Sequence, residues 1–151
     1  MNKKQTLTKS PKETKEFAKE LLREWLGLNT NKNLVICLYG NLGGGKTTFV
    51  QGLAEELGIK ETVNSPTFLI IKKYTAAKNK TAGKKYSLYH FDCYRVFGYQ
   101  EILDLGFEEI ISGKNNIIAI EWPEKIKKIL PEERIDVKFK FVDEDIRKII
   151  I

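Results

Sequence analysis

The chain has 151 residues, of which 42% are hydrophobic and 30% are charged, and we expect a single domain over residues 1–151. No apolar run approaches the roughly 20 residues that cross a bilayer, and the polar start lacks the apolar segment of a signal peptide, so we expect a cytoplasmic protein with no membrane partner. The net charge of +6 comes from 22 lysines and only four arginines, a balance compatible with polyanions but poor in the guanidinium groups that read nucleic acid bases.

The first third of the chain predicts a helix, a buried strand and a second helix. Ser10 begins a capping-box pattern with proline next to it, and apolar residues at helical spacing predict a helix over 11–26. The continuous apolar run LVICLY at 34–39 is typical of a central strand that is buried on both faces. A helix is predicted over 46–57 and ends at Gly58.

A β-hairpin is predicted in the middle of the chain. The segments 67–75 and 85–91 are rich in strand-forming residues and flank a polar stretch, so they can pair with one another. We expect lysines to crowd the tip of this hairpin, at positions 72, 73, 78, 80, 84 and 85.

The last third predicts mixed elements. Helical spacing over 99–112 is interrupted at a glycine, which indicates two short helices or one broken helix. NIIAIE at 116–121 predicts a second buried strand, and a short helix is expected over 124–130. The segments 137–142 and 147–151 predict a terminal hairpin.

The loop that follows the first strand carries a nucleotide-binding pattern. Its sequence GNLGGGKT matches the Walker A motif at every required position, and it lies between a predicted strand and a predicted helix, a context that argues against a chance glycine-rich turn. Glycines let backbone N–H groups converge on phosphate oxygens, Lys46 can reach the outer phosphates, and the Thr47 hydroxyl can bind Mg²⁺. The candidate nucleotide-binding residues in this segment are Asn41, Leu42, Gly43, Gly44, Gly45, Lys46, Thr47 and Thr48.

Two acidic residues at strand ends are candidates for hydrolysis, which needs a carboxylate near the metal or the attacking water. Glu121 ends the second buried strand, and the proline two residues later favours an ordered turn that faces the site over a solvent-exposed side chain. Asp92 ends the hairpin strand and is either a second catalytic acid or only a turn residue. His90 lies two residues earlier, on the same strand face, although a lone histidine on a strand is more often structural.

The segment Ser65-Pro66-Thr67 lies where many phosphate-binding proteins place a loop that senses the outer phosphate. It offers two hydroxyl groups around a rigid proline, and an ordinary turn before a strand is the open alternative.

Four segments in this order resemble the TsaE (YjeE) family: GNLGGGKTTF, NSPTF, YHFDCYR and IEWPE. The resemblance spans nearly the whole chain, and the last three segments are specific to the family, whereas a Walker A motif alone is common to many. Aspartate is common in the family where this chain has Asn41, and alanine where it has Gly44, and neither difference removes a group that contacts phosphate.

The resemblance implies an α/β P-loop NTPase fold with a mixed, mostly parallel sheet flanked by helices and antiparallel hairpins. It implies that the chain binds ATP and Mg²⁺ and hydrolyses ATP weakly, in a way that depends on the partners TsaB and TsaD. In that complex TsaD transfers the threonylcarbamoyl group to tRNA, so the resemblance implies that this chain acts on tRNA through the complex. By position, the family's catalytic residues correspond to Lys46, Asp92 and Glu121, and its magnesium ligands to Thr47 and Glu121. The resemblance also places Trp122 beside the nucleotide or a partner, and Ser10 near the nucleotide base.

Two other functions are compatible with these residues. A P-loop small-molecule kinase is the main alternative, but such enzymes usually use several arginines on the transferred phosphoryl group, and only Arg95 lies in a suitable loop. A nucleotide-dependent module that binds tRNA is favoured by the lysine-rich hairpin tip and overlaps with the main prediction.

Overall fold

The computed structural model describes residues 3–28, 30–78 and 83–151. In chain order the elements are β1 (Gln5–Thr8), α1 (Pro11–Gly27), β2 (Leu34–Tyr39), α2 (Lys46–Glu56), β3 (Ile71–Lys78), β4 (Lys85–Asp92), α3 (Tyr99–Asp104), α4 (Phe107–Ser112), β5 (Asn116–Glu121), the 3₁₀ helix η1 (Pro123–Ile129), β6 (Ile135–Phe141) and β7 (Arg147–Ile150). The predicted helix at 11–26 and the buried strands at 34–39 and 116–121 are confirmed.

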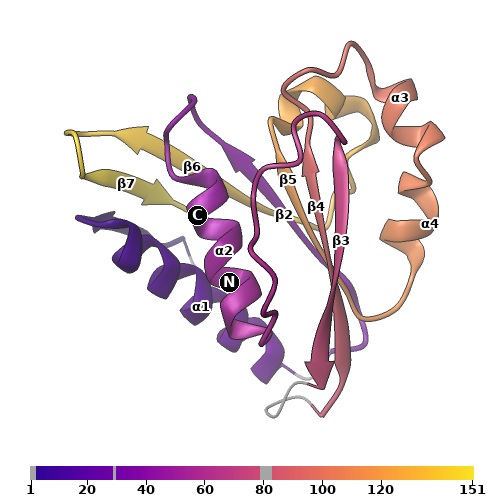
Figure 1. Cartoon of the computed structure of the whole chain (residues 1–151), viewed down its shortest axis with the longest axis horizontal. Coiled ribbons are helices and arrows are strands. Elements are labelled where there is room, and N and C mark those ends of the chain that lie inside the picture. The colour runs from indigo at the N-terminus through magenta and orange to yellow at the C-terminus, as the bar shows by residue number, and fades with distance from the viewer. Residues whose placement is uncertain (1–2, 29, 79–82) are drawn as a thin grey trace.

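All seven of these strands form one mixed sheet in the order β1-β7-β6-β2-β5-β4-β3 (Figure 1). The four central strands β6, β2, β5 and β4 are parallel, whereas β1, β7 and β3 pair antiparallel at the two sides. The predicted α/β class with a mixed sheet is therefore confirmed. Because parallel strands point the same way, the ends of β2, β4 and β5 lie at one edge of the sheet, where open α/β sheets bind ligands.

Two hydrophobic cores cover the two faces of the sheet. Alternate residues of β2 face opposite sides: Ile36 belongs to the core under α1 and α2, and Cys37 belongs to the core with α3, α4 and η1. Figure 1 shows α1 and α2 together on one side of the sheet and α3 and α4 on the other. At Gly52 of α2 a Cβ atom would lie 2.5 Å from the carbonyl oxygen of Lys15, so α1 and α2 approach closely there. Helix α2 is thus anchored against α1.

Three predictions need correction. The segment expected as a strand from 67 begins its strand only at Ile71 and continues to Lys78, because the chain turns over Pro66–Ile70, where the Ile70 N–H donates to the Pro66 carbonyl at 2.6 Å. Ile70 adopts a φ of 66°, outside the strand region. The helix expected over 124–130 is the 3₁₀ helix η1, which has non-helical backbone angles at Ile126.

The third correction concerns β1, which the sequence did not indicate. This four-residue edge strand pairs with β7 far along the chain, and a segment this short carries too few alternating residues to be seen by pattern. The two hairpins, β3 with β4 and β6 with β7, pair antiparallel as predicted.

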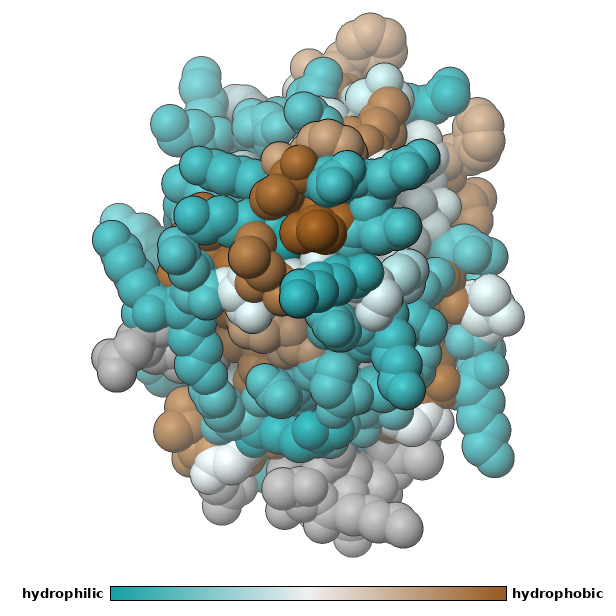
Figure 2. Space-filling model, turned by 90° about the vertical axis from the view of Figure 1, so that its left-hand side faces the viewer, coloured by the Kyte–Doolittle hydropathy of each residue, from teal (hydrophilic) through white to brown (hydrophobic). Residues whose placement is uncertain are grey.

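Two of the lysines expected at the hairpin tip, Lys78 and Lys85, are register partners at the end of β3 and the start of β4, whereas Lys72 and Lys73 lie away from the tip. Lys72 and Lys73 lie over the rings of Tyr74 and Tyr89, and the Lys84 ammonium donates to the Thr30 carbonyl at 3.1 Å. Position 80 lies outside the described residues. On the face drawn in Figure 2, hydrophilic side chains predominate and hydrophobic groups lie in small patches among them. Within the described ranges no helix is both long enough and apolar enough to cross a bilayer.

Candidate functional site

The loop between β2 and α2 presents the start of a helix to solvent. Gly45 precedes α2 with a φ of 97°, a left-handed conformation that favours glycine, and in the described structure no side chain caps this helix. A Cβ atom on Gly44 would lie 2.8 Å from the Asn41 carbonyl oxygen, so the loop is folded tightly on itself. The first N–H groups of α2 therefore remain available to an anion, which the positive end of the helix dipole also favours.

Lys46 is the first residue of α2, and only 4% of it is exposed. Its ammonium donates to the carbonyl oxygens of Gly40 and of Asn41, the latter at 2.9 Å, and lies 4.4 Å from the centre of the Trp122 ring. Burial lowers the pKa of Lys46, while the nearby carboxylates of Glu121, Glu124 and Asp92 act in the opposite direction. The loop thus holds a buried cation at the place where an anionic ligand would meet it.

Glu121 lies at the end of β5 with 3% of its surface exposed. Its Oε1 atom accepts a hydrogen bond from the Thr47 hydroxyl at 2.8 Å and lies 2.8 Å from Nε2 of His90. Glu121 therefore faces the start of α2 and not the solvent. The sequence favoured a structural role for His90, and in the structure His90 contacts the same carboxylate.

Asp92 lies directly beside Glu121, because these two residues are register partners on the parallel strands β4 and β5. Its Oδ2 atom accepts hydrogen bonds from the hydroxyls of Ser65 and Thr67, the latter at 3.0 Å, and its Oδ1 atom accepts from the Tyr94 N–H at 2.9 Å. Asp92 stabilises the turn that follows β4, which is one of the two alternatives left open by the sequence, and a catalytic role for it stays a prediction. It also ties the Ser65–Thr67 loop to the edge of the sheet.

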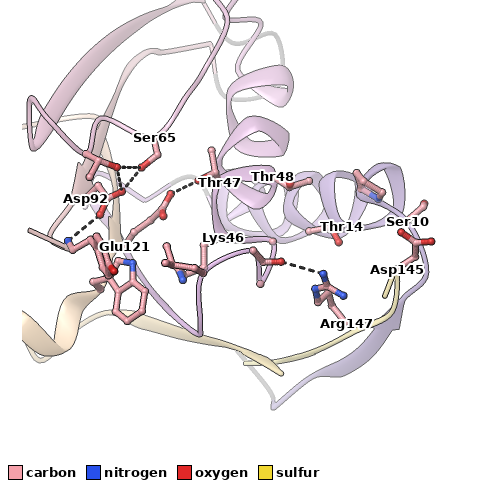
Figure 3. Close-up of a pocket in the computed structure, with 18 of the residues that line it drawn as sticks. Ser10, Thr14, Lys46, Thr47, Thr48, Ser65, Asp92, Glu121, Asp145 and Arg147 are labelled. Carbon is pink, nitrogen blue, oxygen red and sulfur yellow. Dashed lines mark hydrogen bonds between the residues drawn. The ribbon is translucent and has the colours of Figure 1, made fainter. Parts of the chain in front are cut away.

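These residues surround one pocket of about 330 Å³ (Figure 3). It is lined by Ser10, Pro11, Thr14, Leu42, Gly43, Gly44, Gly45, Lys46, Thr47, Thr48, Ser65, Thr67, Asp92, Tyr94, Glu121, Trp122, Glu144, Asp145 and Arg147. All the candidate site residues lie on its wall except Asn41, which contributes only its carbonyl group to Lys46. In Figure 3, Asp92 and Glu121 lie at one end of the pocket and Ser10 and Asp145 at the other.

Sequence analysis missed the residues that come from the β6–β7 hairpin. The Arg147 guanidinium donates to the Gly43 carbonyl oxygen at 3.0 Å and lies 5.1 Å from the centre of the Phe141 ring. Arg147 thus holds the loop between β2 and α2 from outside. No local pattern marks it, because the contact depends on a strand pairing more than 100 positions further along the chain.

An aromatic group adjoins the pocket on the side of Asp92. Trp122 has a φ of 57°, an unusual value for a residue other than glycine, and its ring lies 5.0 Å from that of Tyr94. Phe97 is fully exposed and Phe68 is 83% exposed, and the Arg95 guanidinium lies 4.7 Å from the centre of the Phe68 ring. We refer to Phe68, Tyr94, Arg95 and Phe97 as the aromatic face.

Comparisons with known proteins agree with one another. The family described as "Threonylcarbamoyl adenosine biosynthesis protein TsaE" matches residues 8–149. The chain is 39% identical to the tRNA threonylcarbamoyladenosine biosynthesis protein TsaE of Bacillus subtilis over 142 residues, which cover 94% of this chain and 80% of that relative. It is 38% identical to the protein of the same name from Rickettsia prowazekii, covering 91% of this chain and 87% of the relative. The crystal structure of Bacillus subtilis YdiB matches with a TM-score of 0.71 and 33% identity, over 99% of this chain and 84% of that one.

Proposed function

The chain belongs to the TsaE family of tRNA threonylcarbamoyladenosine biosynthesis, and from this premise we propose that it is the ATP-binding and ATP-hydrolysing component of that machinery. In this proposal residues 1–151 form one P-loop NTPase domain that acts in the cytoplasm. The observation that carries the proposal is the buried Glu121 carboxylate bonded to the first turn of α2, next to a helix start that no described side chain caps.

The pocket has the groups that a nucleoside triphosphate requires. The backbone N–H groups of the loop would cradle the phosphates, and Lys46 would exchange its two carbonyl partners for phosphate oxygens, which are stronger acceptors for a cation. Ser10, at the opposite end of the pocket, would lie near the base. The 330 Å³ volume falls at the lower end of the range usual for small-molecule sites.

The donor set also fits Mg²⁺. Among the described residues no cluster of three or more histidine, cysteine, aspartate or glutamate side chains could hold a metal by itself. Mg²⁺ is usually bound through one or two protein oxygens together with substrate phosphates and water, and Thr47 and Glu121 supply two adjacent oxygens. When bound, the ion neutralises charge on the phosphates. Glu121 and Asp92 would orient the metal shell and the attacking water, and Lys46 would stabilise the charge that develops on the phosphoryl group.

We further propose that ATP hydrolysis depends on TsaB and TsaD, and that the chain acts on tRNA only through their complex. Two features support a partner at this side of the molecule: the exposed aromatic face, and the Ser65–Thr67 loop that Asp92 holds beside it. Exposed aromatic side chains that gather at one place are typical of protein interfaces. A loop with two hydroxyls near the outer phosphate can differ between the ATP and ADP states, which would couple the nucleotide to the partner.

The positions of the arginines do not favour the alternative function, a small-molecule kinase. Arg95 lies on Phe68, Arg147 holds the Gly43 carbonyl, and the other two pair with carboxylates, Arg23 with Glu56 and Arg134 with Asp136. Among the described arginines only Arg147 lines the pocket, whereas such kinases usually use several arginines on the transferred phosphoryl group.

One experiment tests the proposal: titration of the chain with ATP by calorimetry, followed by measurement of phosphate release with TsaB and TsaD present and absent. We expect binding that Mg²⁺ strengthens and turnover that rises with the partners. Glu121→Ala should reduce turnover by about 100-fold or more while ATP binding without Mg²⁺ changes little, because the backbone groups that hold the phosphates remain. Absence of ATP binding by the wild-type chain, or equal loss of binding and turnover in the variant, would contradict the proposal.

A further inference from the structure

His90 lies in the interior of the sheet and still contacts the site. It belongs to β4, where it pairs in register with Ala119 of β5, and none of its surface is exposed. From there its Nε2 atom reaches Oε1 of Glu121 across the two strands at 2.8 Å. The Thr47 hydroxyl donates to the same oxygen, so Oε1 acts as an acceptor and Nε2 of His90 must carry the donated proton.

The other ring nitrogen of His90 makes this contact unusual. Nδ1 is fully buried and has no hydrogen-bond partner among the described residues. A buried polar atom without a partner destabilises the folded state, and most such atoms in proteins are satisfied. A leucine at this position would fill the space without that penalty. The folded state alone therefore does not account for a histidine here, whereas a role for its Nε2–H group does.

We propose that His90 is a positioning residue, which holds Glu121 through Oε1 so that Oε2 faces the phosphate end of the pocket. This inference rests on the proposed ATPase function. Thr47 also binds Oε1, but it belongs to the first turn of α2 and follows the phosphate loop, whereas His90 stands on the strand next to β5. His90 thus sets the carboxylate relative to the sheet, in the way that outer residues orient metal-binding carboxylates in other sites.

Two amide substitutions of His90 distinguish a side chain that donates a hydrogen bond to Glu121 from one that only fills the space with a polar group. In His90→Gln the side-chain NH₂ can occupy the place of Nε2 and donate to Glu121, whereas in His90→Asn the same amide is one methylene shorter and falls near the place of Nδ1. His90→Leu fills the cavity and donates nothing. All three are compared with the wild type in the full-length chain.

We expect His90→Leu and His90→Asn to lower ATP turnover by about 10- to 100-fold, the range typical of residues that orient a metal ligand, and to weaken Mn²⁺ binding to the ADP-bound chain by a similar factor. Mn²⁺ serves as a paramagnetic probe for Mg²⁺, so its affinity is read by electron paramagnetic resonance without any turnover. ADP affinity measured in EDTA should stay within about threefold of the wild type, because the loop that holds the phosphates is untouched. His90→Gln should recover most of both losses, and thermal unfolding of each variant reports its fold.

The possible outcomes distinguish a failure of the positioning role of His90 from a failure of the proposed ATPase function. If the wild type binds no ATP, the proposed function fails, and the inference fails with it. If the wild type is active but folded His90→Leu and His90→Asn match it in turnover and Mn²⁺ affinity, only the inference fails. It also fails if folded His90→Gln is as impaired as His90→Asn, because the effect then follows the loss of the ring and not the loss of the donor.

Discussion

The two ends of the pocket are built in different ways. At the end where we propose that the phosphates bind, called the phosphate end, Lys46, Asp92 and Glu121 are each at most 4% exposed and are joined to their neighbours by hydrogen bonds. At the opposite end, Glu144 and Asp145 are exposed in the turn between β6 and β7, and Ser10 is half-buried at the start of α1.

The two ends differ in the exposure of their side chains because they are built from different parts of the backbone. The phosphate end lies at the ends of parallel strands in the middle of the sheet, where neighbours on both sides fix each side chain. The opposite end is formed by a helix start and a hairpin turn, which are mobile, solvated parts of most proteins. Single substitutions should therefore have large effects at the phosphate end and small effects at the other.

Lys46→Ala should give the largest effect on binding. Removal of the cation proposed to bind phosphate through charged hydrogen bonds, worth about 1.5–3 kcal/mol, corresponds to roughly a 10- to 150-fold loss of ATP affinity. Calorimetric titration measures it, with Lys32→Ala as the control, because Lys32 is exposed and pairs with Glu133 outside the pocket. A folded Lys46→Ala variant with unchanged ATP affinity would show that the buried cation does not meet the phosphates.

Asp92→Ala should come next, with about a tenfold loss of turnover and a free energy of unfolding lower by about 1–3 kcal/mol, because the Ser65 and Thr67 hydroxyls lose a buried acceptor. Phosphate release and urea unfolding measure the two quantities. Asp104→Ala is the control, since the exposed Asp104 carboxylate accepts from the exposed Gln100 in α3, outside the pocket. Wild-type turnover in a destabilised Asp92→Ala variant would show that Asp92 only supports the turn.

Thr67→Val should have a smaller effect, confined to the coupling between nucleotide and partner. The substitution keeps the shape and removes one hydrogen bond to the Asp92 carboxylate, while Lys46 and the backbone groups proposed to hold the phosphates are unchanged, so ATP affinity should change by less than about threefold. The difference in partner affinity between the ATP and ADP forms should shrink, and Thr75→Val on the exposed side of β3 should leave it intact. Equal partner affinity of the wild type in both nucleotide states would refute the switch.

Ser10→Ala should have the smallest effect on the site. Ser10 caps α1 by accepting from the Glu13 N–H at 3.2 Å, and loss of such a cap lowers stability by about 1 kcal/mol. ATP affinity should change by less than about threefold, since the residue lies at the solvated end. Urea unfolding measures the stability, and calorimetry measures the ATP affinity. A tenfold loss of ATP affinity with unchanged stability would overturn the contrast between the two ends.

The sequence alone was sufficient to pick out the loop between β2 and α2 and the central strands. The loop is contiguous, so the Walker A pattern of its glycines, Lys46 and Thr47 is visible in their spacing. The strands at 34–39 and 116–121 were visible because a strand buried on both faces is a continuous apolar run, and Glu121 was visible as the polar residue that ends one of them.

Only the tertiary structure decided how the other groups meet. The order β2-β5-β4 places Asp92 beside Glu121 and brings His90 within hydrogen-bond distance of it, and the pairing of β6 with β7 brings Arg147 to Gly43. The turn at Pro66–Ile70, where a strand was expected, brings Thr67 to Asp92. These contacts join residues from about 25 to more than 100 positions apart. Strand order and register determine them, and a local pattern of residues contains neither.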